Sequence, residues 1–371
     1  DVLIGILAER INDERFLRLI RKFLKAGYME QWEYKNTYIG TPQGGIISPI
    51  LANIYLDKLD KFMRNYINVF NKGKARVRNP EYKRVANRKD KRVKKLKNET
   101  DEQKKEALRR EIAILHREMQ QLPATLDMDE NFKRMRYVRY ADDFLIAING
   151  SKEDCEWIKA QLTEFIRGTL KMELSQKKTL ITHSNDCARF RGYDVRVRRD
   201  QQVKPWKNCK QRTMNNTVEL LIPFRDKIEK YLFTKGAIKQ RPDNGKLEPV
   251  ARIDLTRNTD FEIVTTYDAE SRGLCNFYYL ASNYRNLNYF SYLMEYSCLK
   301  TLAWKHKCKL SKIYDKYRIG AKRWGIPYET KFGRKVRKLT KFNEVDGKRC
   351  EDTIPTIVTI IAKSRTTIDS R

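Results

Sequence analysis

Two adjacent carboxylates, Asp142 and Asp143, are the side chains of this chain whose type and spacing most directly suggest chemistry. They separate two short apolar runs, 135–140 and 144–148, and this pattern predicts a β-hairpin with both carboxylates at its tip. Neighbouring like charges in an apolar setting repel each other, and a cation relieves that repulsion. Mg²⁺ suits such a place because it binds carboxylate oxygens and keeps waters and substrate phosphates as further ligands. Carboxylate-bound metals can activate a hydroxyl and stabilise a leaving pyrophosphate, although aspartate is also common in ordinary turns.

The elements around this hairpin must hold the carboxylates in place. Upstream, a Gly/Pro-rich loop precedes a long predicted helix, for which Ser48 is expected as the N-cap and Pro49 as the first residue. The paired glycines that begin at Gly44 allow close backbone approach to a ligand, and Gln43 can both donate and accept hydrogen bonds. A plain junction between loop and helix is the alternative interpretation.

The flanking segments follow helical and strand patterns. Residues 1–27 predict two helices, the second capped by Asn12 or Asp13, and residues 33–39 predict a strand. After the hairpin, apolar residues from 155 to 166 predict an amphipathic helix. The stretch 174–181 is expected to be a loop entering a strand, and 190–195 a strand or hairpin.

The composition points to a polyanionic partner. The 371 residues include 78 Lys and Arg against 47 Asp and Glu, a formal net charge of +31. Nucleic acid is favoured over a membrane surface, since no apolar stretch approaches the length of a membrane span. The 7 cysteines are scattered without a CxxC pair, which indicates reduced thiols in an intracellular protein rather than a zinc site or a disulfide framework.

A basic segment at about 72–134 interrupts the path from the glycine loop to the hairpin, and it is interpreted as an insertion. Residues 74–97 are rich in Lys and Arg, which predicts a solvated surface segment or an RNA-binding arm. Apolar residues from 108 to 122 recur at helical spacing. One helix packed on the domain is expected there rather than a coiled coil, because the pattern is short.

From about residue 210 the pattern turns helical, and the apolar stripes 218–232, 263–280 and 289–303 predict a helical bundle. Their aromatic residues are more simply explained as bundle core than as stacking partners for bases. Basic residues beside the stripes are the better candidates for RNA contact, namely Arg272, Arg285, Lys300, Lys305, Lys307 and Lys309. Residues 320–350 are expected to be basic and loop-rich, and 354–362 to form a strand or short helix.

The order of these elements resembles the fingers and palm of a group II intron-encoded reverse transcriptase: glycine loop, basic insertion, Tyr-Ala-Asp-Asp hairpin and Arg-Gly-Tyr turn. The stretches 267–278 and 287–307 resemble the maturase region of that family, called domain X, which also forms the thumb. Retron-type and other bacterial reverse transcriptases share the palm motifs but generally lack this region.

The resemblance implies an α+β right-hand polymerase fold. Residues 1–205 would form the fingers and palm, incomplete at the N-terminus, 206–320 the helical thumb or domain X, and 321–371 a basic segment that can begin a DNA-binding region. It also implies binding of intron RNA, help in its splicing, and copying of that RNA into DNA by target-primed reverse transcription.

Site roles follow from the same resemblance. Asp142 and Asp143 would be catalytic and hold Mg²⁺. The residues expected at the nucleotide and template are Pro42, Gln43, Gly44, Tyr140 and Lys178, and those expected in the primer grip are Arg191, Gly192 and Tyr193. Arg191 stands where the family usually has an apolar residue. Expected partners are group II intron RNA, target DNA and deoxynucleoside triphosphates, with no membrane and a homodimer as one option. The bacterial cytoplasm is the expected location, with an organellar matrix as the alternative.

Two departures and one rival accompany the resemblance. The family has a third metal-binding Asp shortly before the position of Asp1, so residues 1–371 alone are expected to lack a ligand and not to polymerise. Longer members carry an HNH endonuclease with paired cysteines, a pattern not found up to Arg371. The rival is a splicing-only maturase, against which the intact Tyr-Ala-Asp-Asp motif argues.

Overall fold

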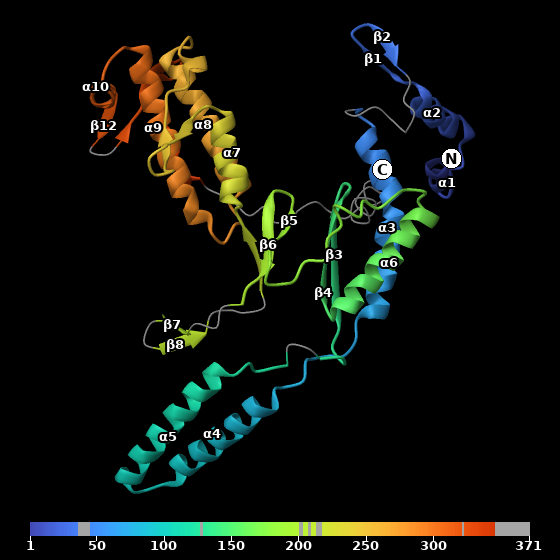
Figure 1. Cartoon of the computed structure of the whole chain (residues 1–371), viewed down its shortest axis with the longest axis vertical. Helices are drawn as coiled ribbons and strands as arrows, with labels where there is room; N and C mark the ends of the chain where they lie inside the picture. Colours follow the sequence, from blue (N-terminus) through green and yellow to red (C-terminus); the bar gives the residue numbers. More distant parts are fainter. Residues whose placement is uncertain are drawn as a thin grey trace, which may run out of the picture. The chain divides into compact units, whose positions relative to one another are not determined.

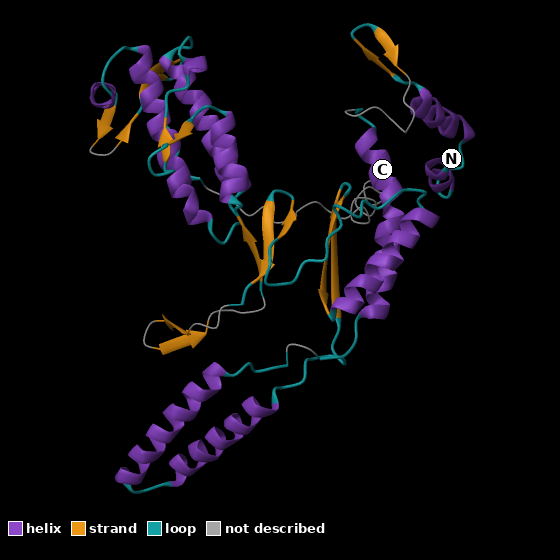
Figure 2. Ribbon diagram, in the orientation of Figure 1, coloured by secondary structure: helices purple, strands orange, loops and turns teal. Residues whose placement is uncertain are grey.

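The computed structural model describes residues 1–35, 45–126, 129–199, 203–206, 209–212, 217–320 and 323–345. Helices and strands are mixed along these residues (Figure 1; Figure 2), which confirms the α+β class in its coarse form. The chain divides into two compact units. Unit 1 comprises Asp1–Arg191 and Arg196–Val218, and unit 2 comprises Gly192–Val195 and Glu219–Arg371.

Unit 1 begins with the two predicted helices, α1 (Val2–Ala8) and α2 (Glu14–Lys25). The Asp13 side chain accepts hydrogen bonds from the first backbone N–H groups of α2, so the predicted cap is confirmed. Strands β1 (Tyr28–Glu30) and β2 (Glu33–Lys35) then pair antiparallel. Residues 36–44, which include most of the predicted glycine loop, lie outside the described residues.

The core of unit 1 forms where two long helices meet the predicted hairpin. Helices α3 (Ser48–Phe70) and α6 (Lys152–Gly168) pack apolar residues against β3 (Arg134–Tyr140) and β4 (Asp143–Asn149). The buried members of this cluster include Leu59, Met63, Met135, Ile158 and Leu162. Ser48 is the first residue of α3 and Ile47 stands at the N-cap, so the cap lies one residue earlier than predicted.

The basic insertion forms a helical hairpin of α4 (Pro80–Asn98) and α5 (Glu102–Gln121), visible as the long paired helices in Figure 1. The expectation that the second helix packs on the domain is wrong. Helix α5 packs against α4, and none of its own residues, all of which are described, is buried. Ion pairs from Arg88 to Glu118 and from Arg92 to Glu111 join the two helices.

Strands near the unit boundary are β5 (Ala188–Phe190), β6 (Tyr193–Val197), β7 (Val203–Trp206), β8 (Cys209–Arg212) and β9 (Val218–Leu221). The strand or hairpin predicted at 190–195 is confirmed. Two other predictions are wrong. The strand predicted to follow the loop at 174–181 is absent, since residues 171–187 are all described and contain no strand. The apolar stripe predicted as a helix from Val218 begins instead as strand β9. Short apolar runs fit either type of element when periodicity alone is used.

Unit 2 has the predicted helical core. A π-helical turn (Phe224–Glu229) leads into α7 (Lys230–Thr234), followed by α8 (Asp260–Phe277), α9 (Leu287–Lys305) and α10 (Leu310–Lys316). Single-turn 3₁₀ segments stand at Ile253–Leu255 and Tyr284–Asn286. The core includes Tyr267, Phe290, Leu293 and Leu302, each fully buried. The Tyr267 hydroxyl lies 2.8 Å from Ser297 Oγ, so even this buried polar atom is satisfied.

Small hairpins surround these helices. They are β10 (Ile238–Gln240) with β11 (Leu247–Pro249), β12 (Arg318–Gly320) with β13 (Arg323–Trp324), and β14 (Ile326–Thr330) with β15 (Gly333–Arg337). A 3₁₀ turn, Phe342–Glu344, ends the described chain. The expectation of a loop-rich segment from 320 onward is therefore wrong for the strand residues up to 337. The buried Asp268 of α8 binds this segment, accepting a hydrogen bond from Thr340 N at 2.8 Å and pairing with Arg337 at 3.1 Å.

Candidate functional site

The predicted carboxylates lie at the tip of the β3–β4 hairpin. Tyr140 pairs with Asp143, which leaves Ala141 and Asp142 as a two-residue turn. Ala141 has a φ of 53°, in the left-handed region that tight hairpin turns require. Both Asp142 and Asp143 are exposed. The hairpin thus presents two adjacent carboxylates to solvent, as the sequence predicts.

Arg139 fixes the base of this turn to helix α3. Its guanidinium donates from Nε to Asp60 Oδ1 at 2.8 Å and from Nη2 to Asp60 Oδ2 at 2.6 Å. The remaining Nη1 donates to the Ala141 carbonyl at 2.7 Å and to Asn53 Oδ1 at 3.2 Å. Because a bidentate arginine–carboxylate pair constrains direction as well as distance, the turn is held against the helix.

Electrostatics reinforce this contact. Burial opposes ionisation of Asp60, but hydrogen bonds from Arg139 and Tyr137 outweigh it and lower the pKa of the carboxyl below its ordinary value. Burial and the bond to Asp60 raise the pKa of the Tyr137 hydroxyl, which donates to Asp60 Oδ1 at 2.9 Å. The Asp60–Arg139 pair is therefore charged near neutral pH and mostly shielded from solvent, with side-chain exposures of 22% and 10%.

Arg191, the last residue of the first segment of unit 1, lies beside Asp143 and Tyr140. Its guanidinium carbon lies 3.7 Å from the centre of the Tyr140 ring, and its Nη1 lies 3.9 Å from Asp143 Oδ2. Arg191 is predicted for the primer grip and Tyr140 for the nucleotide site, and the structure places their side chains in contact. The cation lies over the ring face, where the aromatic quadrupole attracts it.

The donor set at the tip fits a divalent cation that binds oxygen. Asp142 and Asp143 offer carboxylate oxygens, and Mg²⁺ characteristically completes its shell with water and substrate phosphates. Within the described part of the chain, no group of three or more His, Cys, Asp or Glu side chains is arranged to enclose a metal. Two carboxylates fill only part of a Mg²⁺ coordination shell, so the remaining ligands would come from water and substrate phosphates.

The other residues predicted for the site are not gathered at the hairpin tip in the described structure. Lys178 is exposed in the loop after α6, and Pro42, Gln43 and Gly44 lie outside the described residues. Gly192 and Tyr193 belong to unit 2, where the Tyr193 hydroxyl donates to the Phe277 carbonyl and the Tyr193 and Phe277 rings stack at 5.5 Å.

Gly192 has a φ of 81°, and a Cβ there would lie 3.3 Å from the Phe277 ring. Glycine therefore suits both the backbone conformation and the tight packing at this position.

The predicted RNA-contact residues differ in exposure and in whether a nearby carboxylate pairs with their charge. Lys300 binds Glu248 at 3.2 Å and the Pro249 carbonyl at 2.8 Å. Lys305 binds Asp260 at 2.7 Å and is half-buried. These two lysines have carboxylate partners inside unit 2. Arg272, Arg285, Lys307 and Lys309 are exposed, with Arg272 3.9 Å from Asp268.

Sequence reasoning missed Asp60 and Arg139 as positioning residues. One signal was present: Asp60 follows the buried Leu59 within the apolar stripe of α3, where a carboxylate needs a partner. Its partner, 79 residues away, could not be named from spacing alone.

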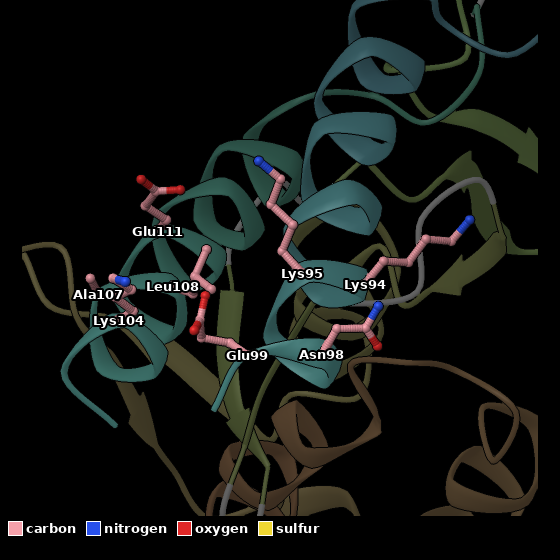
Figure 3. Close-up of a pocket in the computed structure, with 8 residues that line it drawn as sticks. All are labelled: Lys94, Lys95, Asn98, Glu99, Lys104, Ala107, Leu108 and Glu111. Atoms are coloured by element: carbon pink, nitrogen blue, oxygen red, sulfur yellow. The ribbon is translucent and has the colours of Figure 1, made fainter. Parts of the chain in front are cut away.

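A hollow lies elsewhere in unit 1, at the closed end of the α4–α5 hairpin (Figure 3). It measures about 620 Å³, and the residues that line it are Lys94, Lys95, Asn98, Glu99, Lys104, Ala107, Leu108 and Glu111. Lysine and glutamate side chains share its wall, and the residues predicted for catalysis contribute nothing to it.

Residues 215–365 match the family model of the type II intron maturase, so this chain carries a maturase domain of group II introns. The resemblance inferred from the sequence is thereby confirmed. The match covers the α8 and α9 region in which that resemblance was read.

Similarity to individual proteins extends beyond that domain. The chain is 47% identical to the group II intron-encoded protein LtrA of Lactococcus lactis subsp. cremoris, over 370 residues that cover 100% of this chain and 61% of that protein. It is 37% identical to the putative COX1/OXI3 intron 1 protein of Saccharomyces cerevisiae, over 85% of this chain and 37% of that protein. The chain thus spans less than two thirds of the length of these relatives.

The helices that the structure describes are not membrane spans by length and hydropathy.

Proposed function

We propose that this chain is the reverse transcriptase and maturase part of a group II intron-encoded protein, with fingers and palm residues in unit 1 and a thumb in unit 2. It binds its intron RNA, assists splicing, and copies the RNA into DNA by target-primed reverse transcription during homing. The observation that carries this proposal is the exposed Asp142–Asp143 pair, clamped through Arg139, in a chain that also carries a maturase domain.

In this proposal the residues at the hairpin tip position the reacting groups. Asp142 and Asp143 hold Mg²⁺, which when bound would activate a primer hydroxyl and stabilise the leaving pyrophosphate. Arg139 keeps the turn in one place relative to α3. Arg191, beside Asp143 and Tyr140, orients primer or nucleotide phosphates. Lys178, Pro42, Gln43 and Gly44 contact the nucleotide and template.

Primer extension on an RNA template with Mg²⁺ tests this proposal. Because the relatives are longer than this chain, the assay uses the full-length polypeptide that contains it. The double variant Asp142→Ala, Asp143→Ala should lose DNA synthesis by a factor of about 10³ or more, while intron RNA binding stays intact. The exposed Asp186→Ala is the matched control. Undiminished synthesis by the double variant would refute the catalytic assignment.

A splicing-only maturase is the second candidate, and the maturase match over residues 215–365 favours it as much as it favours the first. It predicts that the wild-type protein splices its intron but extends no primer, and that the double variant splices equally well. Target DNA, deoxynucleoside triphosphates and a homodimeric state belong only to the first proposal. Both fit the bacterial cytoplasm or an organellar matrix.

A further inference from the structure

One face of helix α9 in unit 2 carries a row of exposed tyrosines. Tyr289, Tyr292 and Tyr296 are 43%, 46% and 38% exposed. Their neighbours Phe290 and Leu293 are fully buried. The aromatic stripe predicted as bundle core is therefore core only in part, because the three tyrosines lie on the side of α9 that turns away from it.

The tyrosine rings contact one another along the helix. The centres of the Tyr289 and Tyr292 rings lie 6.3 Å apart with planes 11° from parallel, and those of Tyr292 and Tyr296 lie 4.5 Å apart. The Phe224 ring adds a contact to Tyr289 at 6.1 Å. Spacings of three and four residues place these rings on one helical face. Mutual contact limits their rotation and makes the row a preformed aromatic surface, which we call the tyrosine row (Tyr289, Tyr292 and Tyr296).

Cationic groups stand at both ends of the tyrosine row. The exposed Arg285 precedes it, one turn before Tyr289. Lys300 follows it, one turn after Tyr296. At that second end Glu248 is approached by Lys300 at 3.2 Å, by Arg241 at 3.2 Å and by Lys239 at 3.8 Å. Three cations around one carboxylate leave an excess of positive charge.

We infer that the tyrosine row is a binding surface for unpaired RNA, with bases stacked on the rings and phosphates held by the flanking cations. Aromatic rings accept any base because every base has a π face, and basic groups beside them follow the backbone. Tyrosine hydroxyls keep the exposed row compatible with water. This surface deepens the proposed function by naming which part of unit 2 takes single-stranded rather than duplex RNA.

Binding of a labelled 12-nucleotide oligoadenylate to the full-length polypeptide tests the inference, with a 12-base-pair RNA duplex as the second probe. The variant Tyr292→Leu, Tyr296→Leu should weaken oligoadenylate binding roughly tenfold or more, since stacking on one ring contributes about 1–3 kcal/mol per base. Duplex affinity should change less than twofold. The slope of affinity against salt should stay the same, because the phosphate contacts remain.

Two matched variants separate stacking from folding. Tyr292→Phe, Tyr296→Phe keeps the rings and should bind oligoadenylate like the wild type. Phe233→Leu removes an aromatic side chain of similar exposure, 43%, outside the row and should also bind normally. Equal loss for both probes, or no loss for oligoadenylate, overturns the inference. So does a change of oligomeric state without a change in RNA binding, which would make the row a contact between copies. These binding assays require neither polymerisation nor splicing, so failure of the proposed function would not alter their results.

Discussion

At the residue scale, Arg139 does most to define the candidate site. Its side chain satisfies Asp60 twice and the Ala141 carbonyl once, so one guanidinium links the turn that bears the carboxylates to helix α3. Removal of either member of a pair this well shielded leaves the other as a buried, unpaired charge, and that penalty is the reason the pair matters for stability.

Arg139→Ala should therefore destabilise unit 1 by about 3–5 kcal/mol and sharply reduce primer extension. The double variant Asp60→Leu, Arg139→Met should recover much of the stability but not the activity, because the turn stays unclamped. Urea denaturation and primer extension measure the two effects. Arg136→Ala, an exposed arginine on the same strand, is the control. Equal losses in Arg136→Ala and Arg139→Ala would contradict a specific role.

In unit 2, Asp260 connects three elements and gives stability a dependence on pH. Burial opposes its ionisation, yet hydrogen bonds from Lys305, Tyr317 and His306 lower its pKa from 3.8 to about 2. A lowered pKa in the folded state stabilises at pH values above the unfolded pKa, and that stability is lost as pH falls through the folded pKa.

We expect this contribution, about 2 kcal/mol, to be present at pH 5 and to disappear between about pH 4 and pH 2. Asp260→Asn should lower the stability of unit 2 at pH 5 and flatten the decline below pH 4. Urea unfolding across this range, compared with the exposed Asp243→Asn, measures it. If wild type and Asp260→Asn lose stability in parallel on acidification, Asp260 is not the group responsible.

At the element scale, the α4–α5 hairpin is the feature that the sequence described least well. Helix α4 carries many Lys and Arg, and the pairs Arg88–Glu118 and Arg92–Glu111 use only some of them against α5. Lys91, Lys94 and Lys95 remain exposed, and the last two line the hollow at the closed end of the hairpin. A two-helix arm with this charge is suited to phosphate contact without base readout.

Lys94→Ala, Lys95→Ala should weaken intron RNA binding and reduce the slope of log affinity against log salt by about 1 to 2, since each phosphate contact releases counterions. Ala is a strong helix former, so α4 itself should persist. The comparison variant is Lys171→Ala, Lys177→Ala, in the exposed loop after α6. An unchanged slope in the α4 variant, measured by filter binding, would exclude the arm from the RNA contact.

At the scale of the whole molecule, the formal charge of +31 dominates behaviour in solution. Charges spread over both units favour fast, long-range attraction of a polyanion, and this attraction is screened by salt. The two units divide the proposed work, with the carboxylate hairpin in unit 1 and the maturase match mainly in unit 2.

Intron RNA affinity should fall by about a thousandfold or more between 50 and 200 mM salt if six or more phosphates are contacted. Filter binding across a salt series measures the slope, and replacing chloride with glutamate controls for anion effects. A flat dependence would mean that the basic surface does not carry the binding.

The sequence by itself determined the features that depend on local periodicity. Alternation of period two and a two-residue break place Asp142 and Asp143 at a hairpin tip, and spacing near 3.6 predicts α2, α6, α8 and α9. Asp13 caps the helix that it immediately precedes, so its role could also be predicted from the sequence. Such features involve residues close in the chain, where geometry follows from residue type.

Only the tertiary structure decided which distant side chains meet and which faces remain exposed. The Arg139–Asp60 contact joins residues 79 positions apart. Helix α4 is one of several elements against which the apolar stripe of α5 could pack, and the sequence does not select it. The tyrosines of α9 share their helix with core residues, and sequence alone gives no reason to set Tyr292 apart from Leu293. The physical reason is that burial depends on the position of every other element, whereas periodicity describes one element alone.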